Sequence, residues 1–154
     1  MTELTMSESI FVAAAPDEVY AMVSDVTRTG EWSPICRTCR WDDGAGPWVG
    51  AWFTGRNETP ERTWETRSQV VAADPGREFA WEVNDGWAYW GYTFESENDG
   101  TRVTEIWKFL PKGLNGFREL FGDQADAEIE KRRDAARTGI PATLAAIKKV
   151  AEGS

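Results

Sequence analysis

The chain has 154 residues, a formal charge of −9 and no histidine. The length suits one compact domain over residues 1–154, and the acidic excess argues against nucleic-acid binding, which needs clustered Lys and Arg side chains. Residues 1–9 lack the pattern of a signal peptide, and no apolar run approaches the roughly 20 residues of a membrane span, so we expect a cytoplasmic protein with no membrane span.

Residues 4–41 are expected to form a strand, a helix, a short turn and a second strand. Residues 4–13 alternate loosely between apolar and polar side chains, as a strand does. Pro16 suits the first position of a helix, and Asp17 and Glu18 favour its positive end. The buried stripe of this helix would consist of Val19, Met22, Val23 and Val26. Residues 31–34 then predict a turn or short helix before a strand over residues 35–41.

Cys36 and Cys39 form a C-x-x-C motif within the second expected strand. A zinc site would need a second pair of ligands, and a thioredoxin-like site would need a helix N-terminus beside a βαβ unit. The sequence shows neither pattern. Because residues three apart in a strand point to opposite faces, we do not expect a disulfide between them. We interpret the pair as reduced, structural thiols.

Residues 49–57 predict a further strand after a loop over residues 42–47. Its small and aromatic residues Ala51, Phe53 and Gly55 are expected to face inward. Because side chains alternate along a strand, this orientation places Trp48 and Trp52 on the outside.

Residues 64–109 predict four antiparallel strands with turns centred on residues 75–76, 85–86 and 98–99. If the first two turns have two residues each, Trp81 faces Val70 and Trp90, and Trp90 faces Trp107. The neighbouring row would read Ala72, Phe79, Tyr92 and Glu105. A period of two then assigns whole strands to one face. The apolar face would contain Trp64, Val70, Phe79, Trp81, Val83, Trp90, Tyr92, Phe94, Val103, Trp107 and Phe109.

After residue 113 the pattern becomes helical. Phe117, Leu120 and Phe121 indicate a short apolar turn, and residues 122–123 indicate a break and an N-cap before a long helix. The stripe of this helix, which should cover the apolar sheet face, consists of Ile140, Leu144, Ile147 and Ala151. Pro141 removes one backbone donor, so we expect a kink there.

The expected order is one strand, two short helices, six strands and a long helix, which is the helix-grip arrangement. Several segments also carry a family resemblance: residues 15–20, 24–26, 31–34, 49–57, 75–79, 100–105 and 142–144. With them the chain resembles the START-like superfamily (SRPBCC), in its bacterial polyketide cyclase/dehydrase-like branch, nearly from end to end. The resemblance implies an α+β fold in which a curved antiparallel seven-stranded sheet wraps around a long C-terminal helix.

The resemblance implies a cavity between sheet and last helix that holds a small hydrophobic molecule, such as a lipid, sterol, polyketide or aromatic metabolite. The residues favour this too, because three indoles share one row and the helix stripe includes the small residues Ala135 and Ala136. The simpler alternative for any one of these Trp residues is ordinary core packing. The expected ligand-binding residues are Trp64, Thr66, Ser68, Trp81, Trp90, Tyr92, Glu105, Trp107, Phe117 and Phe121.

Glu105 is expected to point inward, where a lone ionised carboxylate is costly unless it is hydrogen-bonded. Tyr92 is the expected neighbour, and Thr66 or Ser68 could add hydroxyl groups. Such a carboxyl group could anchor a ligand's hydroxyl or act as a general acid or base with a raised pKa. Alternatively, it is a structural carboxylate bonded to Tyr92 or to a base such as Arg56.

Catalysis has little support in the sequence. Without histidine, no serine or cysteine has its usual base, and no metal-ligand cluster or phosphate-binding loop is recognisable, so we expect no catalytic residue, cofactor or metal. A polyketide cyclase, aromatase or dehydratase would have only Glu105 and Tyr92 as candidates. A third alternative is a regulatory module that binds a protein partner through residues 131–133. We expect a monomer or a homodimer.

Overall fold

The computed structural model describes residues 4–153. The first half contains β1 (Thr5–Val12), α1 (Pro16–Ser24), the 3-10 helix η1 (Val26–Glu31), β2 (Cys36–Trp41), the 3-10 turn η2 (Asp42–Gly44) and β3 (Trp52–Thr59). The second half contains β4 (Arg62–Asp74), β5 (Glu78–Val83), β6 (Ala88–Glu97), β7 (Gly100–Phe109), α2 (Pro111–Phe121), η3 (Gly122–Gln124) and α3 (Ala125–Ala151).

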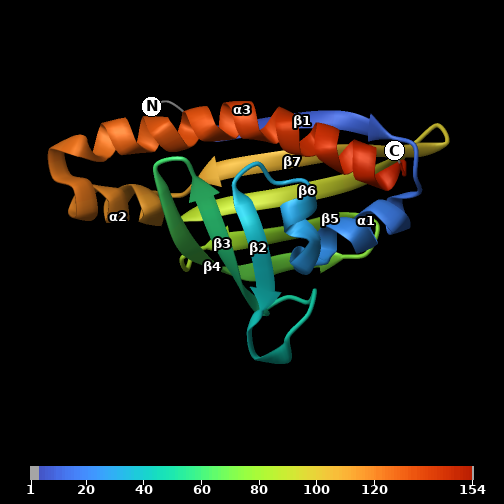
Figure 1. Cartoon of the computed structure of the whole chain (residues 1–154), viewed down its shortest axis with the longest axis horizontal. Coiled ribbons are helices and arrows are strands. Elements are labelled where there is room, and N and C mark those ends of the chain that lie inside the picture. Colours follow the sequence, from blue (N-terminus) through green and yellow to red (C-terminus); the bar gives the residue numbers. More distant parts are fainter. Residues whose placement is uncertain (1–3, 154) are drawn as a thin grey trace.

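Seven antiparallel strands form one curved sheet in the order β1-β7-β6-β5-β4-β3-β2. The helices lie on one face of this sheet: α3 runs along β1 and β7, α1 lies at the opposite end from α2, and α2 packs beside the start of α3 (Figure 1). This is the α+β helix-grip fold that the sequence predicts. No helix among residues 4–153 is long and apolar enough to cross a lipid bilayer.

The central row of the sheet has the predicted register. Trp81 pairs with Val70 on β4 and with Trp90 on β6, and Trp90 pairs in turn with Trp107 on β7. The turn between β6 and β7 has two residues, 98 and 99, as predicted. The loop between β5 and β6 is longer than the predicted two residues: residues 83 and 88 form the last pair, so the loop contains residues 84–87. The register is nevertheless the predicted one.

β4 carries a bulge at Val71 that the sequence pattern did not reveal. The turn before β5 contains residues 75–77 rather than two residues, so Ala73 and not Ala72 lies opposite Phe79. Ala72 pairs with Ala80 instead, and the extra residue Val71 restores the predicted pairing beyond it. The prediction of Ala72 opposite Phe79 was wrong, because a longer turn and a bulge compensate each other.

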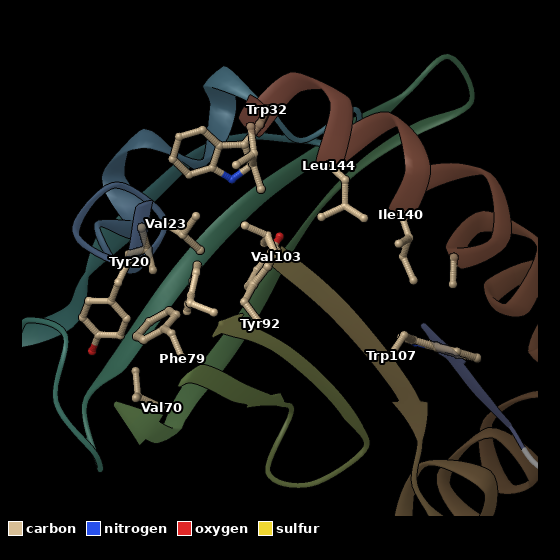
Figure 2. Packing of buried hydrophobic residues seen from close by; sticks show 14 of the residues in the cluster. Tyr20, Val23, Trp32, Val70, Phe79, Tyr92, Val103, Trp107, Ile140 and Leu144 are labelled. Atoms are coloured by element: carbon tan, nitrogen blue, oxygen red, sulfur yellow. The ribbon is translucent and has the colours of Figure 1, made fainter. Parts of the chain in front are cut away.

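The predicted division of the sheet into two faces is correct. Seven of the eleven residues assigned to the apolar face are buried: Val70, Phe79, Tyr92, Phe94, Val103, Trp107 and Phe109. The other four, Trp64, Trp81, Val83 and Trp90, are partly buried. The Tyr20 ring of α1 lies edge-to-face with the Phe79 ring, with centroids 6.3 Å apart. In Figure 2, Ile140 and Leu144 point from α3 toward the sheet.

The two tryptophans near the start of β3 lie outside the core, as predicted. Ala51 and Phe53 are 5% exposed, whereas Trp48 in the preceding loop is 57% exposed. The ring of Trp52 stacks on the outer face against Arg67, whose guanidinium carbon lies 4.4 Å from the ring centroid. A charged side chain therefore covers this outward-facing indole.

The C-terminal segment differs from the prediction in its first part. Residues 111–121 form a full helix, α2, rather than a short turn, and Leu120 is 67% exposed. α3 starts at Ala125 after a 3-10 turn, and no side chain caps it, so the predicted N-cap at residues 122–123 was wrong. α3 continues through Pro141 as one helix, with the predicted stripe residues Ile140, Leu144 and Ile147 buried.

Candidate functional site

A cavity of about 450 Å³ lies between the concave face of the sheet and α3. Pockets that hold drug-sized molecules have volumes of roughly 300–1,000 Å³, so this cavity can hold a small organic molecule. All ten residues predicted to bind a ligand line it: Trp64, Thr66, Ser68, Trp81, Trp90, Tyr92, Glu105, Trp107, Phe117 and Phe121. The sheet curvature, the register of β4–β7 and the position of α2 bring them together.

The cavity exists because the side of α3 that covers it carries small residues. Ala135, Ala136, Gly139 and Thr143 form this part of the wall. A Cβ added to Gly139 would find no neighbouring atom closer than Cγ of Pro34, at 4.0 Å. One step around the helix, Ile140 reaches the sheet and holds α3 in place (Figure 2). The large residue Ile140 thus packs α3 against the sheet, while the small residues beside it on the helix leave the cavity unfilled.

Aromatic rings cover much of the remaining surface of the cavity. Trp81, Trp90 and Trp107 form a continuous row across three strands. Phe117 of α2 closes one end, with its ring centroid 4.9 Å from that of Phe109 and 5.1 Å from that of Phe121 in edge-to-face contacts. Such rings present large apolar areas with few degrees of freedom, which suits the binding of flat or ring-shaped molecules.

Glu105 is the acidic group buried in the cavity wall. Glu105 is 3% exposed, and the Tyr92 hydroxyl donates a hydrogen bond to its Oε2 atom over 3.1 Å. The Oε1 atom is buried and has no hydrogen-bond partner among the described residues. Burial raises the pKa of Glu105 to about 8, although the hydrogen bond from Tyr92 opposes the shift. Near neutral pH the group is therefore mostly a neutral carboxylic acid.

Two other expected partners, Arg56 and Thr66, do not bond to Glu105. Arg56 is exposed on the opposite face of β3 and makes no contact with the carboxyl group. The Thr66 hydroxyl instead accepts a hydrogen bond from Nδ2 of Asn57 over 3.1 Å. Tyr92 is thus the one predicted partner that the structure brings to Glu105, and a single hydrogen bond leaves half of the carboxyl group available to a guest.

Two arginines that are not among the predicted residues, Arg62 and Arg132, also line the cavity. The Arg62 guanidinium stacks over Trp64, 4.1 Å from the ring centroid, and the Arg132 guanidinium lies 5.3 Å from the ring centroid of Phe117. Burial and the neighbouring Arg62 lower the pKa of Arg132. Glu128 forms an ion pair with Arg132 over 3.6 Å and offsets only part of this positive charge. Two guanidinium groups so close together favour a negatively charged group between them.

The remaining wall comes from η1 and β2 and was also missed. It includes Thr29, Trp32, Cys36 and Cys39. Thr29 lies in η1 and Trp32 directly after it, whereas Cys36 and Cys39 lie on the edge strand β2. No periodic pattern in the sequence indicated that these segments line the cavity. Within residues 4–153 no cluster of three or more His, Cys, Asp or Glu side chains could hold a metal ion.

A second hollow of about 610 Å³ is an open groove on the outer side of β2–β4. Its lining is polar and includes three acidic residues, of which Asp42 accepts hydrogen bonds from Arg67 and Thr54, each over 2.8 Å. The hydrogen bond from Arg67 holds the pKa of Asp42 below its usual value. With its polar groups paired and little apolar surface, the groove is a weaker candidate than the interior cavity.

Comparison with known proteins agrees with the fold. A family described as "Polyketide cyclase / dehydrase and lipid transport" matches residues 3–152. The Polyketide_cyc-like protein Cgl2372 from Corynebacterium glutamicum is 57% identical, with a TM-score of 0.73 over 98% of this chain and 93% of that chain. No protein with a curated function matches the chain.

More distant structures share the fold alone. Ms6760 from Mycobacterium smegmatis is 17% identical, with a TM-score of 0.68 over 96% of this chain and 90% of that chain. The di-domain ARO/CYC BexL from the BE-7585A biosynthetic pathway is 18% identical, with a TM-score of 0.73 over 99% of this chain and 52% of that chain. The chain therefore belongs to the polyketide cyclase/dehydrase and lipid transport family, within the START-like superfamily.

Proposed function

We propose that this protein binds a small hydrophobic molecule, namely a lipid, a polyketide or an aromatic metabolite, in the cavity between the sheet and α3. The observation that carries the proposal is a hollow of about 450 Å³ between a row of three indoles and a helix face of small residues. An apolar guest there would remove its own surface and that of the rings from water, which is worth roughly 25 cal/mol per Å² of apolar area.

The polar groups of the cavity indicate how a guest would be oriented. Glu105 offers a neutral carboxyl group in the wall, so a hydroxyl or carbonyl of the guest would lie there. Arg62 and Arg132 also line the cavity, where an acidic group of the guest would meet their guanidinium groups. The preferred guest is therefore an apolar molecule with a neutral polar group near Glu105 and an acidic group near the two arginines.

A polyketide cyclase or dehydratase is the second candidate, and the state of Glu105 favours it. A carboxyl group with a pKa near 8 can donate a proton or a hydrogen bond to a carbonyl or to a leaving hydroxyl at neutral pH. BexL is an ARO/CYC protein, and the family description also includes cyclases and dehydrases. The reaction would need no metal or cofactor, and Tyr92 would hold the carboxyl group in position.

The third alternative, a protein-binding module, gains no support from the run at residues 131–133. Lys131 and Arg132 both pair with Glu128, over 2.9 and 3.6 Å, and Arg133 lies 3.9 Å from Glu130. The helix therefore pairs Lys131 and Arg133 with its own acids, as is common on solvated helix faces, whereas Arg132 lines the cavity and shares Glu128 with Lys131.

Binding is tested by tryptophan fluorescence during titration with a fatty acid and with 1-anilinonaphthalene-8-sulfonate. A guest that lies against the three indoles should change the emission and saturate at one molecule per chain. Native mass spectrometry of the purified protein would identify any metabolite that stays bound. Unchanged emission with every apolar probe at saturating concentration would contradict the proposal. Replacement of Glu105 by Gln separates the two candidates, since a carrier should retain its guest whereas an enzyme should lose turnover.

A further inference from the structure

Cys36 and Cys39 lie on the same side of β2, with their Sγ atoms 3.2 Å apart. The pairing of β2 with β3 shifts between residues 36 and 38, so that Cys36 pairs with Asn57 whereas Cys39 pairs with Gly55. The extra residue, Arg37, forms a bulge that reorients the strand. The thiols are free, as the sequence analysis expected, but the argument that they point to opposite faces was wrong.

The surrounding backbone leaves room for this pair of sulfur atoms. A Cβ added to Gly55 would lie 3.2 Å from Sγ of Cys39 and 3.4 Å from Sγ of Cys36. On the other side, a Cβ added to Gly30 would collide with the carbonyl oxygen of Arg37 in the bulge. Two glycines thus permit the close approach of β3 and η1 to the bulged strand, and both thiols remain in the cavity wall, partly buried.

The two thiols are not equivalent. Hydrogen bonds from Cys36 and from the Thr29 side chain lower the pKa of Cys39. The shared hydrogen bond with Cys39 and burial raise the pKa of Cys36. Because a thiolate is the attacking form, Cys39 is the nucleophile of the pair and Cys36 the thiol that acts second. With no third ligand nearby among the described residues, a metal does not explain the arrangement.

We propose that Cys36 and Cys39 form a reversible dithiol–disulfide site in the cavity wall, which low-molecular-weight disulfides oxidise. The Cys39 thiolate attacks one sulfur of the small disulfide, forms a mixed disulfide and releases one small thiolate. Cys36 then loses its proton to that thiolate and attacks Sγ of Cys39, which releases the second small thiolate; water returns to it the proton that Cys39 had given up. Two electrons pass from the protein sulfurs to the small disulfide, so one disulfide is consumed and two thiols are produced.

The geometry requires little movement for this bond. An S–S bond is roughly 2.0 Å long, so two sulfur atoms 3.2 Å apart need only side-chain rotations and a small backbone adjustment. The bond would close a loop with only residues 37 and 38 between the cysteines. Such a short loop constrains the unfolded chain little, so the bond should be readily reduced again.

The test uses the full chain, reduced and then exposed to excess glutathione disulfide, trapped with N-ethylmaleimide and weighed under denaturing conditions. We expect a monomer that lacks two hydrogens and carries neither glutathione nor maleimide, and that regains two free thiols after dithiothreitol. Cys36→Ser should stop at a stable adduct of one glutathione on Cys39. Cys39→Ser should react more slowly than Cys36→Ser, because burial raises the pKa of its remaining thiol, whereas the hydrogen bond from Thr29 still lowers the pKa of Cys39 in Cys36→Ser.

Two results would overturn the proposal. One is wild-type protein that retains one or two glutathiones for as long as the Cys36→Ser variant does, since a neighbouring thiol should displace them. The other is a disulfide that forms only between two chains. If a serine variant fails to fold, peptide mapping of the oxidised wild type replaces it. A peptide with an internal bond between residues 36 and 39 supports the proposal, and the absence of such a peptide refutes it.

Discussion

The Tyr92 hydroxyl donates to Oε2 of Glu105 over 3.1 Å, while Oε1 of the same carboxyl group is buried without a hydrogen-bond partner among the described residues. The two side chains face each other across β6 and β7, in directly paired positions. On β1, Glu8 pairs with Glu105 from the other side, but its side chain is exposed. A buried, half-satisfied carboxyl group costs stability, which is the usual situation of a group retained for function.

Replacement of Glu105 by Gln should alter the pH dependence of stability. The folded protein holds this proton more tightly than the unfolded chain does, because the pKa rises from 4.5 to about 8. The wild type should therefore lose free energy of unfolding as pH rises from about 4.5 to about 8, by an amount on the order of 2–5 kcal/mol. Glu105→Gln lacks this loss, so its stability relative to the wild type should increase between pH 5 and pH 9.

Urea denaturation at pH 5, 7 and 9 measures this difference. Tyr92→Phe is the matched control, because it removes the hydrogen bond and keeps the titrating group. It should cost about 1–3 kcal/mol and show a loss of stability with rising pH at least as large as that of the wild type, because the hydrogen bond from Tyr92 opposes the rise of the Glu105 pKa. A difference between Glu105→Gln and the wild type that stays constant from pH 5 to pH 9 would show that Glu105 does not titrate in this range.

Gly139→Leu should abolish binding of apolar probes without loss of stability. Around Gly139 an added side chain finds open space beside Pro34, so leucine would extend into the cavity. Leucine also has a better helix propensity than glycine, by up to about 1 kcal/mol. Thr138→Leu, at the exposed neighbouring position, is the control and should bind as the wild type does. Equal probe affinity in both variants would place the guest elsewhere.

Alanine at two helical glycines should have opposite effects. Gly139→Ala should stabilise the fold by up to about 1 kcal/mol, because nothing crowds the added methyl group. Gly113→Ala should instead destabilise it by about 1–3 kcal/mol, because the methyl group would collide with the backbone carbonyl of Trp87 and lie 2.8 Å from the Phe109 ring. Thermal and chemical denaturation of the two variants measure both effects. Stabilisation by both substitutions would mean that α2 is not packed on Trp87 as described.

The tryptophans should differ sharply in their contribution to stability. Trp107 is 3% exposed, so Trp107→Ala should cost about 3–5 kcal/mol. Trp48 is 57% exposed in a loop, so Trp48→Ala should change stability by less than about 0.5 kcal/mol. Probe binding should be impaired only by the first. Similar costs for both would contradict the assignment of the sheet faces.

Much of the sheet was predictable because its signals are local. Alternation of apolar and polar residues assigns a strand to one face, and the two-residue turn at 98–99 sets the register of β6 and β7. The bulge at Val71 was not predictable, because a three-residue turn with a bulge leaves the same pairing of Val70 with Trp81 as a two-residue turn without one. The bulge at Arg37, which brings two thiols together, likewise leaves no periodic signal in so short a strand.

The sequence by itself determined the succession of the seven strands and the apolar face of the sheet, and the family resemblance pointed to the ten side chains that line one cavity. The strands and their faces follow from periodicity, which each segment carries in its own residues. Only the tertiary structure decided that α3 turns its small residues toward the indoles, that Arg62 and Arg132 line the same cavity, and that Oε1 of Glu105 has no hydrogen-bond partner within residues 4–153. Each of these features depends on how segments far apart in the sequence pack against one another, and the local pattern of residues within one segment does not encode that packing.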